Sequence, residues 1–190
     1  MPAAAYDRDP EVNMTYVSSG EFDVILLVLR VVAGVTLFLH GYNKVFRGGK
    51  IEGTAGWFES MGMKPGKLNA WMAASTEIGA GILLAVGLLT PFAAAGLIGI
   101  MVVASRTDHR GSFFMFKNGW EYVMVFGFLA WGIGALGPGR WSLDNAFGIA
   151  DDLTRDWRGA IIAGVLGVAA GVGTLVVFHH PEPSEEQTAA

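Results

Sequence analysis

Five apolar stretches alternate with polar or turn-forming segments along the 190-residue chain. The first covers residues 24–46, and a helix of its 23 residues would be about 34 Å long, slightly more than the hydrocarbon thickness of a bilayer. The other four stretches cover residues 70–89, 91–106, 119–136 and 159–178. Helices of this kind are typical of membrane spans, so the pattern predicts an all-α, polytopic membrane protein.

The polar segments divide the chain into four parts. We expect a polar tail at 1–23, a four-span membrane domain at 24–148, a charged connector with a fifth transmembrane helix at 149–178, and a disordered tail at 179–190. The first tail could instead be an arm that docks on a partner subunit. After the first span, Thr54–Met61 predicts a short amphipathic segment with its aromatic residues at headgroup depth.

Composition supports the membrane class. The chain is 52% hydrophobic and only 16% charged, its mean hydropathy is +0.44, and its 27 glycines suit close packing of helices in lipid. A net charge of −4 gives no electrostatic footprint for a nucleic-acid partner. The chain has no cysteine, which excludes disulfides and cysteine-ligated iron–sulfur clusters.

The distribution of basic residues predicts an orientation. With five spans, eight lysines and arginines fall on the side of the first long loop and four on the opposite side, while Arg30 lies within a span. The positive-inside rule then places the first loop, the third loop and the C-terminus in the cytoplasm of a cell whose plasma membrane the protein crosses several times. The N-terminus lacks a basic stretch followed directly by an apolar one, so we expect no cleaved signal peptide.

Charged side chains inside the predicted spans are the candidates for chemistry, because an ionisable group in a bilayer is costly. On the first span Arg30 and Lys44 share one face with Gly34 and Gly41, at helical spacing. The second span carries Glu77. Because the two spans run antiparallel, Glu77 lies at the depth of the far end of the first span, away from Arg30. We therefore expect Arg30 to serve the fold or to reach towards the outer surface.

Polar residues from four spans gather at that far end, which the orientation places on the cytoplasmic side. The predicted cluster consists of His40, Lys44, Glu77, Arg106, Asp108, His109 and Glu121. Three interpretations are open: paired charges that hold helices together, a site for a quinone headgroup or a proton relay, and a site completed only by a partner. No residue is assigned as catalytic.

Haem and metal sites are not expected. A bis-histidine haem needs two histidines on facing helices, and only His40 lies within a span, whereas His109 is in a loop and His179 and His180 follow the last span. The chain contains no Walker motif, nucleophile elbow or HExxH sequence. We therefore predict no intrinsic cofactor, with quinone as the candidate small molecule.

Several motifs in order give the chain a family resemblance. They are LRVVAGVTLFLHGYNKVF in the first span, GWFESMGM before the second, EIGAGILLAVGLLTP within it, and then DHRGSFF, GWEY and LGPGRWSLD. The region from residue 24 to about 148 resembles the DoxX family of small membrane proteins. The resemblance implies a four-helix membrane domain, to which this chain adds a fifth span.

The DoxX family takes its name from a subunit associated with a terminal quinol oxidase, and its members are linked to thiosulfate–quinone oxidoreduction and membrane redox complexes. The resemblance thus implies a non-redox accessory subunit of a respiratory complex, with the bilayer and redox subunits as partners. One alternative is a quinone-linked membrane oxidoreductase that uses His40, Glu77 and Arg106. Another is a small-solute carrier or a stress-related membrane protein.

Overall fold

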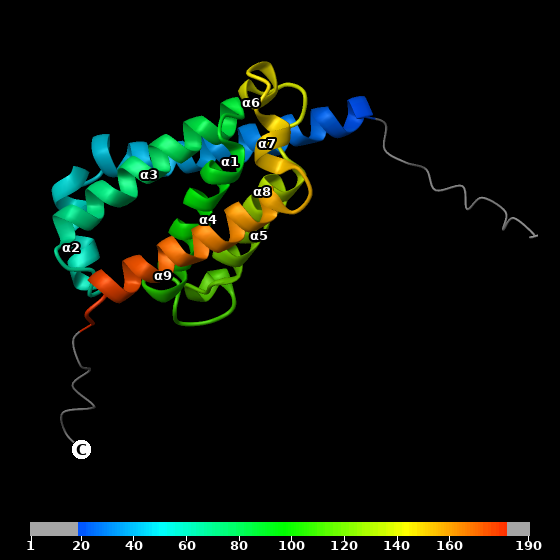
Figure 1. The fold of residues 1–190 in the computed structure, drawn as a ribbon. Coiled ribbons are helices and arrows are strands. Elements are labelled where there is room, and N and C mark those ends of the chain that lie inside the picture. Colours follow the sequence, from blue (N-terminus) through cyan, green and yellow to red (C-terminus); the bar gives the residue numbers. More distant parts are fainter. Residues whose placement is uncertain (1–18, 182–190) are drawn as a thin grey trace, which may run out of the picture.

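A computed structural model describes residues 19–181, and within this range every named element is a helix. The longer helices are α1 (Ser19–Phe46), α2 (Lys50–Ser60), α3 (Gly66–Val86), α4 (Thr90–Arg106), α5 (Glu121–Leu136) and α9 (Gly167–Phe178). The short ones are η1 (Met115–Lys117), α6 (Leu143–Ala146), α7 (Ala150–Thr154), α8 (Arg158–Ile161) and η2 (Ile162–Leu166) (Figure 1). The predicted all-α class is confirmed.

Each predicted apolar stretch forms a helix, and two of these helices meet the length and hydropathy of a membrane span. These are Ser19–Phe46 and the continuous run of α8, η2 and α9, Arg158–Phe178. The apolar helices α4 and α5 are shorter than a full span. At 17 residues, α4 is about 25 Å long. The count of five spans stays a prediction.

Glycines bring α1 and α3 into direct backbone contact. A Cβ atom added to Gly34 would lie 2.5 Å from the carbonyl oxygen of Gly81, and one added to Gly81 would lie 2.6 Å from the amide nitrogen of Phe38. Further along α1, a Cβ atom added to Gly41 would lie 2.8 Å from the carbonyl oxygen of Ala74. Small residues are what allow helices to approach this closely. The face that α1 presents to α3 is therefore the one predicted from its spacing.

Helix α4 is at the centre of the bundle and packs on α3, α5 and α9. The main core is built around it, from small and aliphatic residues of five helical segments. Its buried members are Ala33, Leu37, Ala80, Leu84, Ala93, Ala94, Leu97, Ile98, Ala130, Ile133 and Ala163. Gly167 and Gly171 seat the last helix against α4, because a Cβ on either would meet Ile98 or Val102 at 2.7 or 2.6 Å.

The two predicted tails are shorter than expected where the structure describes them. At the start, residues 19–23 are already helical, and Asp23 is buried with its Oδ1 accepting a hydrogen bond from the Arg140 amide at 2.9 Å. At the end, His179 forms an isolated antiparallel bridge with Met63. Residues 1–18 and 182–190, which hold the rest of both predicted tails, lie outside the described residues.

Two backbone hydrogen bonds fix the C-terminal end of α9 to the turn before α3. The Lys64 amide donates to the Phe178 carbonyl at 2.8 Å, and the His180 amide donates to the Gly62 carbonyl at 2.7 Å. We call these paired segments, 62–64 and 178–180, the clasp. Buried backbone groups need hydrogen-bond partners, and the clasp supplies them while joining the end of α9 to the turn between α2 and α3.

We predict that Gly81→Ala destabilises the protein by about 1–3 kcal/mol, because the new methyl group overpacks the contact with α1. Gly79→Ala is the matched control on the same helix, since nothing lies within 4 Å of its added Cβ. It should leave stability unchanged or raise it by up to about 1 kcal/mol. Denaturant unfolding in detergent micelles measures both. Equal stabilities for the two variants would contradict the glycine contact.

Candidate functional site

Arg30 lies fully buried on α1, at the end of the bundle that also holds the α3–α4 turn. Its Nη2 donates a hydrogen bond to the Trp141 carbonyl at 2.6 Å. The carboxylate of Asp144 acts on it electrostatically. Arg30 therefore does not reach an outer surface, and it serves the fold by joining α1 to the loop after α5.

Asp144 is the partner that the sequence did not reveal. This fully buried carboxylate accepts hydrogen bonds from the Leu89 amide at 2.7 Å, the Thr90 amide at 2.9 Å and the Thr90 hydroxyl at 2.7 Å. Its own amide donates to the Gly87 carbonyl at 2.8 Å. Asp144 thus caps the first turn of α4 from a distant loop, where a negative charge suits the helix dipole.

Gly87 makes room for this arrangement. It ends α3 in the left-handed conformation with φ of 68°, and an added Cβ would overlap Nη1 of Arg30. A glycine is required on both grounds. Arg30, Gly87 and Asp144 together form what we call the structural end of the bundle.

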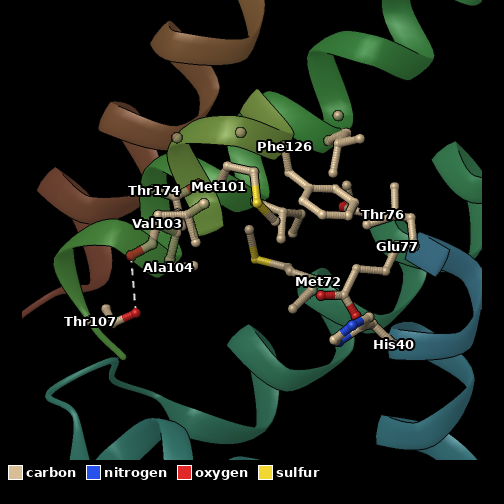
Figure 2. Close-up of a pocket in the computed structure, with 18 of the residues that line it drawn as sticks. His40, Met72, Thr76, Glu77, Met101, Val103, Ala104, Thr107, Phe126 and Thr174 are labelled. Carbon is tan, nitrogen blue, oxygen red and sulfur yellow. Dashed lines mark hydrogen bonds between the residues drawn. The ribbon is translucent and has the colours of Figure 1, made fainter. Parts of the chain in front are cut away.

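Lys44 and Glu77 form a buried ion pair at the opposite end. The Lys44 ammonium lies 2.8 and 2.7 Å from the two carboxylate oxygens, and the side chains are only 14% and 5% exposed. His40 lies one helical turn before Lys44, and Figure 2 shows its ring beside the Glu77 carboxylate. The pairing of α1 with α3 at this depth is the one that the antiparallel comparison predicted.

A cavity of about 450 Å³ opens beside this ion pair, within the range of sites for small molecules. Its walls come from α1, α2, α3, α4, α5 and the last helical run, and most lining residues are apolar. Figure 2 shows Met72 and Met101 reaching into the cavity, with Phe126, Thr76 and Glu77 to one side of both methionines. We call the part next to Glu77 the polar end of the cavity.

Five residues of the predicted cluster line the cavity. They are His40, Lys44, Glu77, Asp108 and His109. Asp108 and His109 form a second acid–base pair, with 3.5 Å between Oδ2 and Nε2. The Nδ1 atom of His109 is buried without a hydrogen-bond partner among the described residues.

Arg106 and Glu121 lie outside the cavity. The residues of α4 that line it include Val103, Ala104 and the adjoining Thr107, which recur at helical spacing, so Arg106 falls on another face and is exposed. Glu121 instead accepts a hydrogen bond from the Met115 amide at 2.9 Å and so supports the turn η1. Of the seven residues in the predicted cluster, five therefore line the cavity and two lie outside it.

Tyr122 joins the polar end, although it was not among the predicted residues. It lines the cavity from the first turn of α5, and the charge of Glu77 acts on it. Its ring centroid lies 5.9 Å from that of His109. The only sequence signal was its place in the GWEY motif, which does not reveal which neighbouring position faces inward.

An exposed pair on the same end of the bundle offers a comparison. Lys67 donates to Glu52 at 3.1 Å across α2 and α3, and this hydrogen bond lowers the pKa of Glu52. A carboxylate with a lowered pKa stabilises the fold above its ordinary pKa, and that contribution is lost as the pH falls through the lowered value. Glu52 is therefore ionised at neutral pH, and its exposed partner Lys67 is a suitable control for Lys44.

No group of three or more histidine, aspartate and glutamate side chains within residues 19–181 is arranged to hold a metal ion. His179 takes part in the clasp, and its Nε2 is buried without a partner in the described part of the chain. His180 contacts the Val177 carbonyl through Nε2 at 3.1 Å and is exposed.

The helical bundle, its membrane-length apolar helices and its cavity with buried charges define a helical membrane protein. Within that class, residues 25–110 match the family model DoxX, which supports the resemblance that the motifs indicate. The match begins within α1, covers α2 to α4 and stops before α5. It is shorter than the region from residue 24 to about 148 that the motifs suggested. No curated protein and no solved structure matches the chain.

We predict that Asp144→Ala destabilises the protein by about 3–5 kcal/mol, because it removes the cap of α4 and leaves Arg30 buried without its counter-charge. Asp151→Ala, at an exposed position of α7, should change stability by no more than about 0.5 kcal/mol. Thermal or denaturant unfolding measures both. Adding Arg30→Met to Asp144→Ala should cost less than the sum of the two single changes, and strict additivity would show that Arg30 and Asp144 do not interact.

Proposed function

We propose that the cavity binds a lipid-soluble quinone or quinol with its headgroup at the polar end, and that the protein is a non-redox accessory subunit of a respiratory complex in the plasma membrane. One observation carries the proposal: an apolar cavity between membrane helices ends in a buried ion pair flanked by two histidines and a tyrosine. Ionisable groups at such depth are expensive and usually functional.

The polar end has the hydrogen-bonding groups that a quinone and its quinol require. The Lys44 ammonium can donate to a quinone carbonyl, and the Glu77 carboxylate can accept from a quinol hydroxyl. Tyr122 and His109 face the same space and can donate to or accept from a second ring oxygen. The same groups are able to take up and release protons, which quinone reduction and quinol oxidation require.

The accessory role follows from the kind of side chains at the polar end. These are acids, bases and hydroxyl groups, which move protons, so the electrons would be exchanged with a partner subunit. The resemblance to the DoxX family implies a membrane redox complex as the setting of this proposed subunit. The predicted orientation, with the first and third loops in the cytoplasm, would place the polar end near the cytoplasmic face.

The lining of the cavity also bears on two alternatives, an ion pair that only holds helices together and a quinone-linked enzyme. An ion pair that only holds helices together needs no cavity beside it, yet Lys44 and Glu77 both line one. A quinone-linked enzyme that relies on Arg106 is disfavoured, because Arg106 is exposed and lies outside the cavity. Headgroup binding uses the groups that remain.

We predict that a lipid-embedded preparation binds a short-chain quinone with quenching of tryptophan fluorescence, since Trp57 lines the cavity. Replacing the ion pair by Lys44→Met with Glu77→Met should weaken binding by roughly 10- to 100-fold, the value of one or two charge-assisted hydrogen bonds. The double change leaves no unpaired buried charge, so the fold should persist.

Lys67→Met is the matched control, because it removes a lysine from the same end of the bundle outside the cavity. It should leave quinone affinity unchanged. Unaltered affinity in the Lys44 and Glu77 double variant, with its fold intact, would show that the pair is only a helix lock.

We predict, for the accessory role, that mild extraction from native membranes yields the protein together with redox subunits. Quantitative mass spectrometry of the affinity-purified material measures this. Glu52→Gln serves as a comparison, because the change lies at an exposed position and should leave the recovered subunits the same. Recovery of the protein alone from mildly solubilised membranes would refute this role while leaving quinone binding open to the titration.

A further inference from the structure

The cavity extends from its polar end along one face of α4. Lining residues recur along this helix at steps of three and four, as in Phe92, Gly96, Ile100, Val103 and Thr107. From Phe92 to Thr107 the rise of a helix gives about 22 Å. An extended hydrocarbon chain could lie along this length, which is much longer than a quinone headgroup.

Two helices form the sides of this groove. Gly96 faces α3, where an added Cβ would meet Ala80 at 3.0 Å, and Gly99 faces the last helix, where one would meet the Gly167 carbonyl at 3.4 Å. Figure 1 shows α3 and α9 running apart with α4 between them. Because α4 has glycines at both contacts, its surface forms the floor of the groove, and α3 and the last helix form the two sides.

The groove is open along its length, from Phe92 to the polar end. Several of its lining residues are substantially exposed, among them Met72 of α3 at 37%, Phe92 of α4 at 44%, Leu166 of η2 at 46% and, at the polar end, Trp57 of α2 at 44%. At the polar end, Met63 lines the cavity and forms the clasp with His179. The opening therefore faces sideways between two apolar helices, where a membrane protein meets lipid.

We propose that the ligand is a long-tailed amphiphile, whose hydrocarbon tail lies in the groove of α4 between α3 and α9 and enters sideways from the bilayer. This rests on the proposed function, since it assigns the tail of the molecule whose headgroup occupies the polar end. The second side of the groove comes from the last helix, beyond the residues that match the DoxX family. The tail site is thus a feature that this chain adds to the DoxX domain.

Two neighbouring alanines give a matched test. Ala170 lines the groove, whereas Ala169 faces a different surface beside Trp131, and both are exposed on the same helix. In Ala170→Trp the indole should fill the groove without touching the polar end. In Ala169→Trp it should project elsewhere.

The experiment titrates each variant in lipid nanodiscs with two quinones that share a headgroup, one with a polyprenyl tail and one without. Ala170→Trp should weaken binding of the tailed quinone about tenfold relative to wild type and change the tail-free affinity less than about twofold. Ala169→Trp should match wild type for both. Comparing variants at a fixed tail cancels the partitioning of the quinone into lipid.

Equal effects of the two tryptophan variants on the tailed quinone would overturn the tail site. If Lys44→Met with Glu77→Met still weakened binding of both quinones in that case, the proposed headgroup site would stand alone. If wild type bound neither quinone, the proposed function would fail, and the tail site with it. Thermal unfolding of both tryptophan variants confirms that the bundle is intact.

Discussion

A charge inside a bundle of apolar helices is tolerated only where an opposite charge meets it, and α1 carries two such charges on one face. Arg30 and Lys44 lie about 21 Å apart along its axis. Arg30 is served by Asp144 and the Trp141 carbonyl, and Lys44 by Glu77. Asp144 and Glu77 lie at opposite ends of the bundle. Because Arg30 and Lys44 must each face its own acid, the depth and rotation of α1 against its neighbours are fixed.

The surroundings of the buried charge differ between the two ends of the bundle. At the structural end, Asp144 also caps α4, and Gly87 lets Arg30 pack without intervening space. At the polar end, the ion pair lies beside a cavity with His40, His109 and Tyr122 around it. At the structural end the Asp144 carboxylate is used up by the Leu89 amide and by Thr90, and Nε and Nη1 of Arg30 are buried without a hydrogen-bond partner among the described residues. At the polar end the charged groups line a cavity that has room for a ligand. This contrast is the physical reason for placing the ligand at Lys44 and Glu77.

Periodicity and depth predicted more of the fold than of the site. Helical spacing gave the face of α1 and the pairing of Glu77 with the far end of that helix, because both follow from regular geometry. Asp144 was missed because its contacts join loops far apart in the chain, which no local pattern encodes. Arg106 and Tyr122 stand at helix ends, where a shift of one residue moves a side chain to another face. The clasp is made by backbone groups and leaves no side-chain signal.

The proposed ligand site is the polar end, which would bind the headgroup of a lipid-soluble molecule. The most direct measurement is photocrosslinking in native membranes with a quinone that carries a photoreactive group on its ring, followed by peptide mapping. We expect labels on the segments around Glu77 and Tyr122, and competition by unlabelled quinone. Labels confined to exposed residues such as Phe128 or Val176, without competition, would contradict it.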